Sequence, residues 1–369
     1  MGVSANQKKV LLVTHYWEAD HFGGRQALSR KNEACLESIL GDNLLRYHIK
    51  PESGAGVFRK FYELVNLRVD GLTREVLLEI LELIETNNVE IVYLDGSTLG
   101  TVAKFLDKEA NVTVATFFHH HETTFFYQLF AAQKSVKALM LFIAVFFVEK
   151  FAINYSRLLL ILTERDREKI LKGVKQKETY ILPMVVNQPV EWESTVERRE
   201  EDDPYVLFVG GGKLLGNHHG IDWFLANVSS QIPYKSVVIG SDYDDLESEY
   251  SNNCQVTFKG RVDDLSSYYV NATAVVCPVF YGSGMKMKVA EALMYGKYVF
   301  GTDEAFIGYE GSIEKVGVKC ESAVEFVDAI GSFEYTAERA KGIKREYVLR
   351  FSGSAQLERF KEILETLQS

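Results

Sequence analysis

Two lysines and a glutamate follow a glycine-rich turn in the segment VVCPVFYGSGMKMKVAEALMYGKYVFGT, residues 275–302. The apolar residues before the turn predict a buried strand, and a helical pattern begins near Met285. Glycine lets backbone N–H groups approach a ligand closely, and a helix N-terminus offers unpaired donors with partial positive charge. Lys286 and Lys288 add full charge there, which favours a phosphate site. Glu291 lies one turn further along nearly the same helix face, where its carboxylate could accept hydrogen bonds from ribose hydroxyls.

A structural reading of the same pattern stays open, because the lysines could simply be solvated side chains of a strand-loop-helix crossover. A second glycine-rich loop, Gly210–Lys213, fits neither of the common nucleotide motifs. Leu215 takes the place of the last glycine in Gly-x-Gly-x-x-Gly, and Lys213 is not followed by Ser or Thr as in a P-loop. The sequence therefore disfavours a dehydrogenase or an ATPase.

Three adjacent histidines, His119–His121, and the triplet Asp242-Tyr243-Asp244 are the residues that most suggest a metal. Side chains of neighbouring residues on an extended segment point to opposite faces, so the three histidines cannot all face one ion. The Asp-x-Asp triplet stands in an acidic loop and is typical of a helix start. The four cysteines are scattered without ligand spacing. We expect no metal site and no cofactor.

These residues must be positioned by two α/β units, because short apolar β-rich runs alternate with helical patterns along the whole chain. Such alternation predicts doubly wound parallel sheets with helices on both faces. The expected strands are residues 9–15, 89–94, 112–118, 158–163, 205–209, 236–239, 256–258, 274–278 and 298–301. The expected helices are 25–40, 74–85, 123–153, 164–172, 217–228, 246–251, 264–270 and 286–295.

One boundary divides these units, at a charged stretch with a proline and no apolar periodicity, NQPVEWESTVERREEDD. We expect a first domain at 1–186, a linker at 187–203, a second domain at 204–336 and charged helices at 337–369. Two doubly wound domains would face each other across a cleft. Their ligands would bind beyond the carboxyl ends of the strands.

Composition limits the partners and the compartment. The formal net charge of −10 over 369 residues disfavours nucleic acid as a partner, because phosphate backbones demand a basic surface. The apolar stretch at the N-terminus is too short for a signal-peptide core, and we expect a cytoplasmic protein. Ala138–Val148 is eleven residues long, too short to span a bilayer. A buried helix is the favoured interpretation, and a helix on a membrane surface is the alternative.

Several segments resemble those of one enzyme family. GSGMKMKVAEALMYGKYVFGT resembles the donor-site motif of the retaining GT-B glycosyltransferases of family four, the group 1 glycosyl transferases. The segments FKGRVDDLSSYYVNATAVVCP and LFVGGGKLLGNHHGIDWFL are also similar to segments of this family. The resemblance continues more weakly in FFHHHETTFFY and LTERD. It implies two Rossmann-like domains facing a cleft, of which the first is on the acceptor side and the second binds the nucleotide sugar.

The resemblance also implies roles for individual residues. Those expected in catalysis are His119, which would touch the donor sugar, and Lys286 and Lys288, which would neutralise the leaving diphosphate. Those expected to bind the donor are Gly23, Gly24, Gly211, Lys213, Arg261, Val262, Gly282, Ser283, Gly284 and Glu291. Among them Arg261 and Val262 would meet the base and Glu291 the ribose. Ser283 stands where many members carry a first glutamate, Glu-x7-Glu, that usually meets the donor sugar, so the sequence leaves the identity of the sugar open.

The implied activity is transfer of a sugar, of hexosyltransferase type, from a nucleotide-diphosphate sugar to a carbohydrate or lipid-linked acceptor in polysaccharide biosynthesis. Retention follows from the resemblance, and metal independence from the fixed lysines with no well-placed Asp-x-Asp. The resemblance also implies domain closure, final helices that pack back on the first domain, and peripheral attachment to the inner face of a membrane. A non-hydrolysing nucleotide-sugar epimerase and a non-catalytic two-domain sugar-binding protein remain the alternatives.

Overall fold

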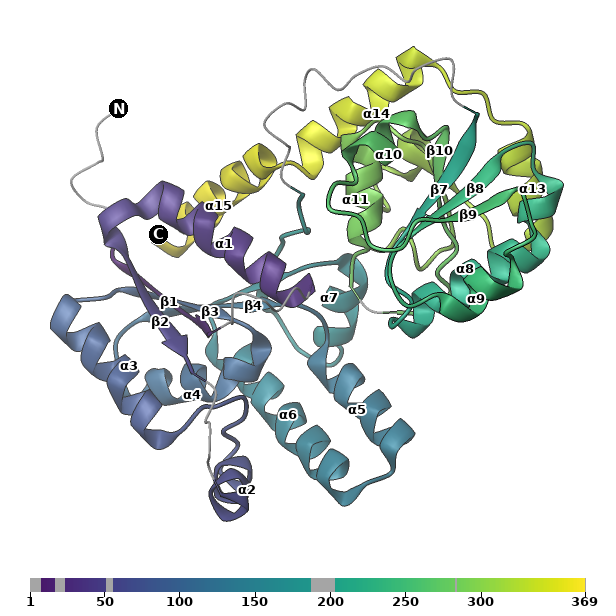
Figure 1. Cartoon of the computed structure of the whole chain (residues 1–369). Coiled ribbons are helices and arrows are strands. Elements are labelled where there is room, and N and C mark those ends of the chain that lie inside the picture. Colours follow the sequence, from purple (N-terminus) through teal and green to yellow (C-terminus); the bar gives the residue numbers. More distant parts are fainter. Residues whose placement is uncertain (1–7, 17–23, 51–55, 187–202, 283, 369) are drawn as a thin grey trace. The chain divides into compact units, whose positions relative to one another are not determined.

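The computed structural model describes residues 8–16, 24–50, 56–186, 203–282 and 284–368. It divides into two compact units (Figure 1). Unit 1 comprises Met1–Pro183 with Leu357–Ser369, and unit 2 comprises Met184–Gln356. Most of the expected linker, with Gly23 and Ser283, lies outside the described residues.

Unit 1 is built on a six-stranded parallel sheet in the order β2-β1-β3-β4-β5-β6. The strands are β1 (Val10–His15), β2 (Leu44–Ile49), β3 (Ile91–Asp95), β4 (Thr113–Phe118), β5 (Leu158–Ile161) and β6 (Glu178–Ile181). The four strands that the sequence predicts are β1, β3, β4 and β5, in which nearly every side chain is buried. The edge strands β2 and β6 were not predicted, because polar residues interrupt their short apolar runs.

The helices of unit 1 differ from the expectation at three points, because those over 57–65 and 100–109 were not predicted and the helical stretch expected over 123–153 is divided. They are α1 (Gly24–Leu40), α2 (Val57–Val65), α3 (Arg74–Asn87), α4 (Gly100–Glu109), α5 (Glu122–Gln133), α6 (Val136–Tyr155) and α7 (Glu164–Ile170). The single helix expected over 123–153 is therefore wrong. Lys134 takes a left-handed conformation that ends α5, and the Ser135 side chain accepts a hydrogen bond from the backbone N–H of Ala138 to start α6.

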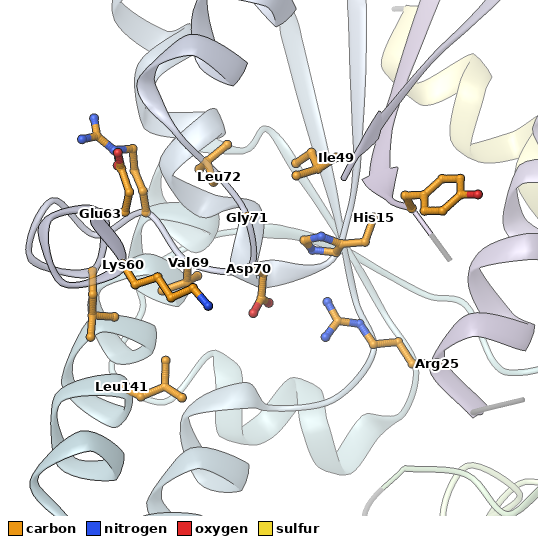
Figure 2. Close-up of a pocket in the computed structure, with 13 residues that line it drawn as sticks. His15, Arg25, Ile49, Lys60, Glu63, Val69, Asp70, Gly71, Leu72 and Leu141 are labelled. Carbon is orange, nitrogen blue, oxygen red and sulfur yellow. The ribbon is translucent and has the colours of Figure 1, made fainter. Parts of the chain in front are cut away.

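A cavity of about 570 Å³ lies in unit 1, bounded by α2, the turn that follows it, α6 and the ends of β1 and β2 (Figure 2). His15 and Arg25 line one side of the cavity and Lys60 of α2 the other, with Asp70 between them in the view of Figure 2. Aliphatic side chains complete the wall, namely Ile49, Leu64, Val69, Leu72 and Leu141.

Unit 2 has a second six-stranded parallel sheet, in the order β12-β11-β10-β7-β8-β9. Its strands are β7 (Tyr205–Val209), β8 (Lys235–Ile239), β9 (Val256–Phe258), β10 (Ala274–Cys277), β11 (Val299–Gly301) and β12 (Gly317–Lys319). Its helices are α8 (Leu215–Asn227), α9 (Asp244–Glu249), α10 (Ser266–Asn271), α11 (Met287–Met294), α12 (Ile313–Val316), α13 (Ala323–Gly331) and α14 (Ala337–Arg350). The short edge strand β12 was not predicted.

The strand orders fix where each unit can bind a ligand. In unit 2 the chain runs outward from β7 through β8 and β9 and then restarts with β10 on the other side of β7. In unit 1 the same reversal separates β1 from β3. Crossovers on opposite faces leave a crevice at the carboxyl ends of the two central strands, where doubly wound sheets bind their ligands.

The two C-terminal helices belong to different units. In unit 2, α14 packs on α11, and Gly296 lies so close to it that an added Cβ would come within 2.8 Å of the Ala340 carbonyl oxygen. Helix α15 (Gly353–Gln368) belongs to unit 1 from Leu357 onward. There the fully buried ring of Phe360 lies 6.1 Å from the ring of Tyr93, centroid to centroid.

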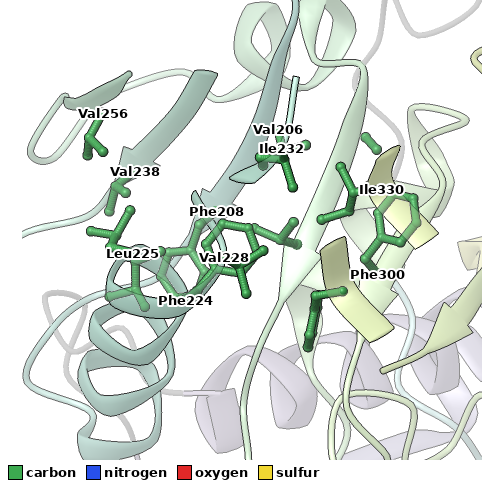
Figure 3. Close-up of a cluster of buried hydrophobic side chains, with 14 of the residues drawn as sticks. Val206, Phe208, Phe224, Leu225, Val228, Ile232, Val238, Val256, Phe300 and Ile330 are labelled. Atoms are coloured by element: carbon green, nitrogen blue, oxygen red, sulfur yellow. The ribbon is translucent and has the colours of Figure 1, made fainter. Parts of the chain in front are cut away.

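The core of unit 2 is formed where α8 and α13 cover the sheet (Figure 3). Phe224 of α8 is fully buried and packs edge-on against Phe326 of α13, with ring centroids 5.8 Å apart. Side chains from the strands complete this core, among them Phe208 and Phe300. The helix face that carries Phe224 therefore holds α8, and the loop before it, against the sheet.

We expect Phe224→Ala to lower the free energy of unfolding of unit 2 by about 3–5 kcal/mol, because it leaves a cavity in a closed core. Urea unfolding followed by tryptophan fluorescence measures the change. Leu215→Ala on the same helix, at a side chain that is 72% exposed, is the matched control and should change stability little. Equal effects of the two substitutions would contradict this description of the core.

Candidate active site

Lys288 occupies the crevice between β7 and β10 in unit 2. It is the second residue of α11 and only 9% exposed. Its Nζ donates a hydrogen bond of 2.8 Å to Oδ1 of Asn217 and lies 4.1 Å from the centre of the Phe208 ring. Burial lowers the pKa of Lys288. The ammonium group is thus held from two sides, by an amide oxygen and by the face of an aromatic ring.

No carboxylate of the described residues forms an ion pair with Lys288, although several other lysines of unit 2 have such partners. A buried charge without a counter-ion is costly. The site is therefore arranged to receive negative charge from a ligand. Asn217, which holds the lysine, lies 71 positions away in the sequence and was not predicted. A polar residue in the first turn after a glycine loop is the signal that could have found it.

Close packing leaves no room for a side chain at two of the glycines after β7. Gly210 has φ of +152°, and an added Cβ would lie 2.9 Å from Nζ of Lys288. A Cβ on Gly212 would lie 2.0 Å from the carbonyl oxygen of Asp242. Gly211 accepts a hydrogen bond of 3.1 Å from the Asn217 side chain through its carbonyl oxygen. The loop can approach a ligand closely because it has no side chains at these positions.

Lys286 lies next to the turn after β10 and precedes α11. Its Nζ donates to the carbonyl oxygen of Gly284 at 3.0 Å and to Oε1 of Glu304 at 2.8 Å. Gly284 has a left-handed φ of +62°, and Gly282 is exposed at the other end of the turn. Lys286 therefore lies where the sequence predicts, beside the turn, but it already has a carboxylate partner.

Glu291 is oriented by tyrosines. Its Oε2 accepts a hydrogen bond of 2.8 Å from the hydroxyl of Tyr269, which is buried and stacks on Tyr295 with ring centroids 5.2 Å apart. The carboxylate is partly exposed. Such an arrangement fixes the direction of a hydrogen-bond acceptor, as recognition of a ribose would require.

The remaining predicted residues of unit 2 lie at its surface. Arg261 is exposed and Val262 partly exposed in the loop after β9. The side chain of Lys213 is 84% exposed and pairs with Asp242 at 3.4 Å. Asp244 begins α9, as the helix start proposed for the Asp-x-Asp triplet requires.

His119 of unit 1 follows β4 and is buried against Asp95 at the end of β3. The two side chains are 2% and 1% exposed, with Nε2 3.4 Å from Oδ1. Burial alone would raise the pKa of Asp95, but the charge of His119 and a hydrogen bond of 2.9 Å from Thr14 lower it to about 2. Asp95 was not predicted, although it ends an apolar strand at the expected edge.

The three adjacent histidines have three different carboxylate partners. While His119 faces Asp95, Nε2 of His120 lies 3.1 Å from Glu122, and Nε2 of His121 lies 3.5 Å from Glu149. Glu149 is itself buried and accepts backbone hydrogen bonds from the start of α5. The triplet thus anchors the turn between β4 and α5 in several directions, rather than converging on one point.

Arg25 lies beside this cluster in the first turn of α1, which begins at Gly24. Its guanidinium is 3.7 Å from Glu122 and donates to Thr98. Arg25 and His15 also line the cavity of unit 1 (Figure 2). The β1/β3 reversal therefore joins a basic group, an imidazole and a cavity at the carboxyl edge of the first sheet.

Comparison with known proteins identifies this arrangement. Residues 203–333 match the family model "Glycosyl transferases group 1". The chain carries a group 1 glycosyltransferase domain. This matched segment contains the β7/β10 crevice with Lys288, Asn217 and Glu291. No match was found among the curated proteins.

Solved structures show that the chain has the GT-B fold. Sucrose-phosphate synthase from Thermosynechococcus elongatus is 17% identical with a TM-score of 0.66, covering 98% of this chain and 99% of that one. HepE from Anabaena in complex with UDP is 13% identical with a TM-score of 0.66, covering 97% of this chain and 100% of that one. The lipopolysaccharide outer core galactosyltransferase WaaB is 13% identical with a TM-score of 0.66, covering 97% of this chain and 99% of that one. Among the residues that the structure describes, no helix is long and apolar enough to cross a bilayer.

We expect Lys288→Met to weaken binding of the nucleotide ligand by on the order of 10–100-fold, because it removes a charge-assisted contact. The same substitution should leave the free energy of unfolding unchanged or raise it, since a buried ammonium is replaced by an apolar chain of similar length. Isothermal titration and urea unfolding measure the two effects. Lys319→Met, at a partly exposed lysine paired with Asp303, is the control. Unchanged nucleotide affinity in Lys288→Met would remove this lysine from the site.

Proposed function

We propose that the protein transfers a sugar, as a hexosyltransferase, from a nucleotide-diphosphate sugar to a carbohydrate or lipid-linked acceptor in polysaccharide biosynthesis. The observation that carries this proposal is the buried Lys288 ammonium, which lacks a carboxylate partner in the part of unit 2 that is described. The UDP complex of HepE and its UDP-glucose complex support the same class of donor.

In this mechanism the residues of unit 2 hold the departing nucleotide. Breakage of the sugar–phosphate bond puts negative charge on the diphosphate, and Lys286, Lys288 and the N–H groups that begin α11 would stabilise it. Glu291 would accept hydrogen bonds from the ribose, with Tyr269 fixing its direction. Gly211, Lys213, Arg261, Val262 and the turn 282–284 would complete the donor site.

Unit 1 would supply the acceptor side. His119 would meet the donor sugar near the reacting carbon, with Asp95 holding the imidazole in place. The 570 Å³ cavity beside His15 and Arg25 has both polar and aliphatic walls, which suits a sugar ring with its hydroxyl and C–H faces. Gly23 and Gly24 would allow the backbone after β1 to approach the donor.

We expect transfer to retain the anomeric configuration and to need no divalent metal, because fixed cations can neutralise the leaving group. The test is release of nucleoside diphosphate from a panel of UDP-, GDP-, dTDP- and ADP-sugars, with and without EDTA. NMR of the first-formed product gives its anomeric configuration. Activity that EDTA abolishes and magnesium restores would overturn metal independence, and an inverted product would overturn retention. Epimerised donor without release of nucleoside diphosphate would favour the epimerase alternative.

We also propose that the enzyme works on the cytoplasmic face of a membrane, attached peripherally through one surface of unit 1. Among the residues that the structure describes, ten of the eighteen exposed large apolar side chains lie on three helices of this unit. They are Phe58, Phe61, Tyr62 and Val65 on α2, and Phe125, Tyr127, Val136, Leu139, Ile143 and Phe147 on α5 and α6. In Figure 1 these three helices extend from the same side of unit 1.

The helix α6 does not bury its apolar residues all round, although a buried helix was the favoured interpretation of Ala138–Val148. Ala138, Ala144, Val145 and Val148 are buried, whereas Leu139, Ile143 and Phe147 are exposed. Exposed Lys134 and Lys137 lie where α5 gives way to α6, and Arg59 and Lys60 are exposed on α2. Apolar side chains bordered by cations are typical of helices that lie in a lipid interface.

We expect the parent protein to co-sediment with vesicles of phosphatidylethanolamine and phosphatidylglycerol. The double substitution Phe58→Asp with Phe61→Asp should abolish co-sedimentation without unfolding the protein, because both side chains are already exposed. Leu78→Asp, at a 50% exposed leucine on α3, is the matched control and should still sediment. Parent protein that stays in the supernatant with both these vesicles and neutral ones would exclude this attachment.

A further inference from the structure

A second carboxylate lies beside the glycine turn that precedes α11. Glu304 follows β11, and its side chain is only 13% exposed. Its Oε1 lies 2.8 Å from Nζ of Lys286 and 3.6 Å from the point where a Cβ on Gly282 would lie. Ser283, within that turn, brings no carboxylate of its own. Glu304 therefore introduces an acidic group from a neighbouring strand at this edge of the sheet.

The position of Glu304 is set by the turn in which it stands. Thr302 donates its hydroxyl to the carbonyl oxygen of Val279, which ties the end of β11 to the loop after β10. The backbone N–H of Ala305 returns to the carbonyl oxygen of Thr302 at 3.0 Å, and the side chains of Ala305 and Phe306 are buried. Asp303 differs from its neighbour, since its side chain is 66% exposed and pairs with Lys319.

A simple counter-ion role does not account for a carboxylate at this place. Lys288, two residues after Lys286, has no carboxylate partner among the described residues, and that is the arrangement that favours an incoming diphosphate. A carboxylate beside Lys286 reduces the positive charge available to the diphosphate and repels it at short range. We therefore expect the Glu304 carboxylate to make a favourable contact with the bound donor that offsets this repulsion.

The chemistry of the donor supplies that contact. The sugar of a nucleotide-diphosphate sugar is bonded through its anomeric carbon to an oxygen of the phosphate farthest from the base, so the sugar ring and its hydroxyls lie next to the groups that Lys286 would neutralise. Hydroxyls are hydrogen-bond donors, and a carboxylate is a strong acceptor that can bind two of them. Glu304, 2.8 Å from the lysine ammonium, lies within reach of that part of the donor.

We propose that Glu304 accepts hydrogen bonds from hydroxyls of the donor sugar and thereby determines which sugars are accepted. This inference rests on the proposed function, and it adds the residue that reads the sugar. Lys286, placed between the diphosphate and Glu304, screens their repulsion. A sugar that lacks the matching hydroxyl, or presents it in the other configuration, cannot form this hydrogen bond and is bound less well.

The test compares the donor with its nucleotide alone. The donor that the parent uses is taken from the panel of nucleotide sugars, and its bare nucleoside diphosphate is measured beside it by titration. Glu304→Gln should raise KM for the donor by on the order of 10–100-fold and reduce discrimination against the C4 epimer of its sugar. Binding of the bare nucleoside diphosphate should change less than about threefold or become tighter, because a like charge has been removed.

Two further variants keep the result interpretable. Glu304→Asp retains the charge beside Lys286 but withdraws the carboxylate, so it should also lose sugar discrimination while it binds the bare diphosphate like the parent. Asp303→Asn, at the exposed neighbour, should change neither measurement. A melting temperature for each variant verifies that it is folded.

The outcomes separate this inference from the function on which it rests. If Glu304→Gln weakens the bare nucleoside diphosphate as much as it weakens the donor, Glu304 acts only by positioning Lys286 and the inference is wrong. Unchanged sugar discrimination in both Glu304 variants is equally decisive against it. If the parent binds no nucleotide sugar of the panel, the proposed function itself fails, whatever Glu304 does.

Discussion

The ammonium group of Lys288 is the constraint around which unit 2 is arranged. A lysine that is 9% exposed and has no carboxylate partner among the described residues would destabilise a fold that did not use it. Asn217 and the ring of Phe208 hold the ammonium, and Gly210 leaves room for it. These groups come from β7, the loop after it, α8 and α11, so the lysine can be held only where the strand order reverses. The core that anchors α8, with Phe224 against Phe326, is therefore also what keeps Asn217 in place.

Unit 1 shows the same fold used with the opposite electrostatics. At its strand reversal, His119 and Asp95 are buried against each other. His119 thus faces a carboxylate, which is the kind of partner that Lys288 lacks among the described residues. Glu149 adds a second buried carboxylate, which is satisfied by backbone N–H groups at the start of α5. The buried carboxylates of this edge thus face imidazole or backbone N–H groups of the same edge. The edge of unit 2 leaves a charge for a ligand to pair.

The exposed apolar helices of unit 1 change how its hydrophobic residues should be understood. In a typical doubly wound domain, the helices that cover the sheet bury an apolar stripe and expose a polar one. Helix α6 is apolar on both faces, and α2 exposes most of its aromatic side chains. Neither feature is needed to hold the sheet together. Both features suit a surface that contacts lipid. The same two helices, α2 and α6, also line the cavity of unit 1.

The sequence by itself determined the features that depend on short stretches of chain. Central parallel strands are largely apolar runs, so β1, β3, β4, β5, β7, β8, β10 and β11 could be predicted, and one edge strand, β9, was predicted with them. Lys286, Lys288 and Glu291 could be selected because a single turn and helix carry all three. The edge strands β2, β6 and β12 could not, since an edge strand needs a less continuous apolar pattern. The division of 123–153 was signalled by Ser135, but a uniformly apolar composition concealed it.

Only the tertiary structure decided which side chains meet. Asn217 reaches Lys288, Glu304 reaches Lys286, Tyr269 orients Glu291 and Asp95 holds His119, each across one or more strand-to-strand crossovers. Crossovers bring all the carboxyl ends of a parallel sheet to one edge, but the pairing at that edge depends on strand order and helix packing, which local sequence patterns do not encode.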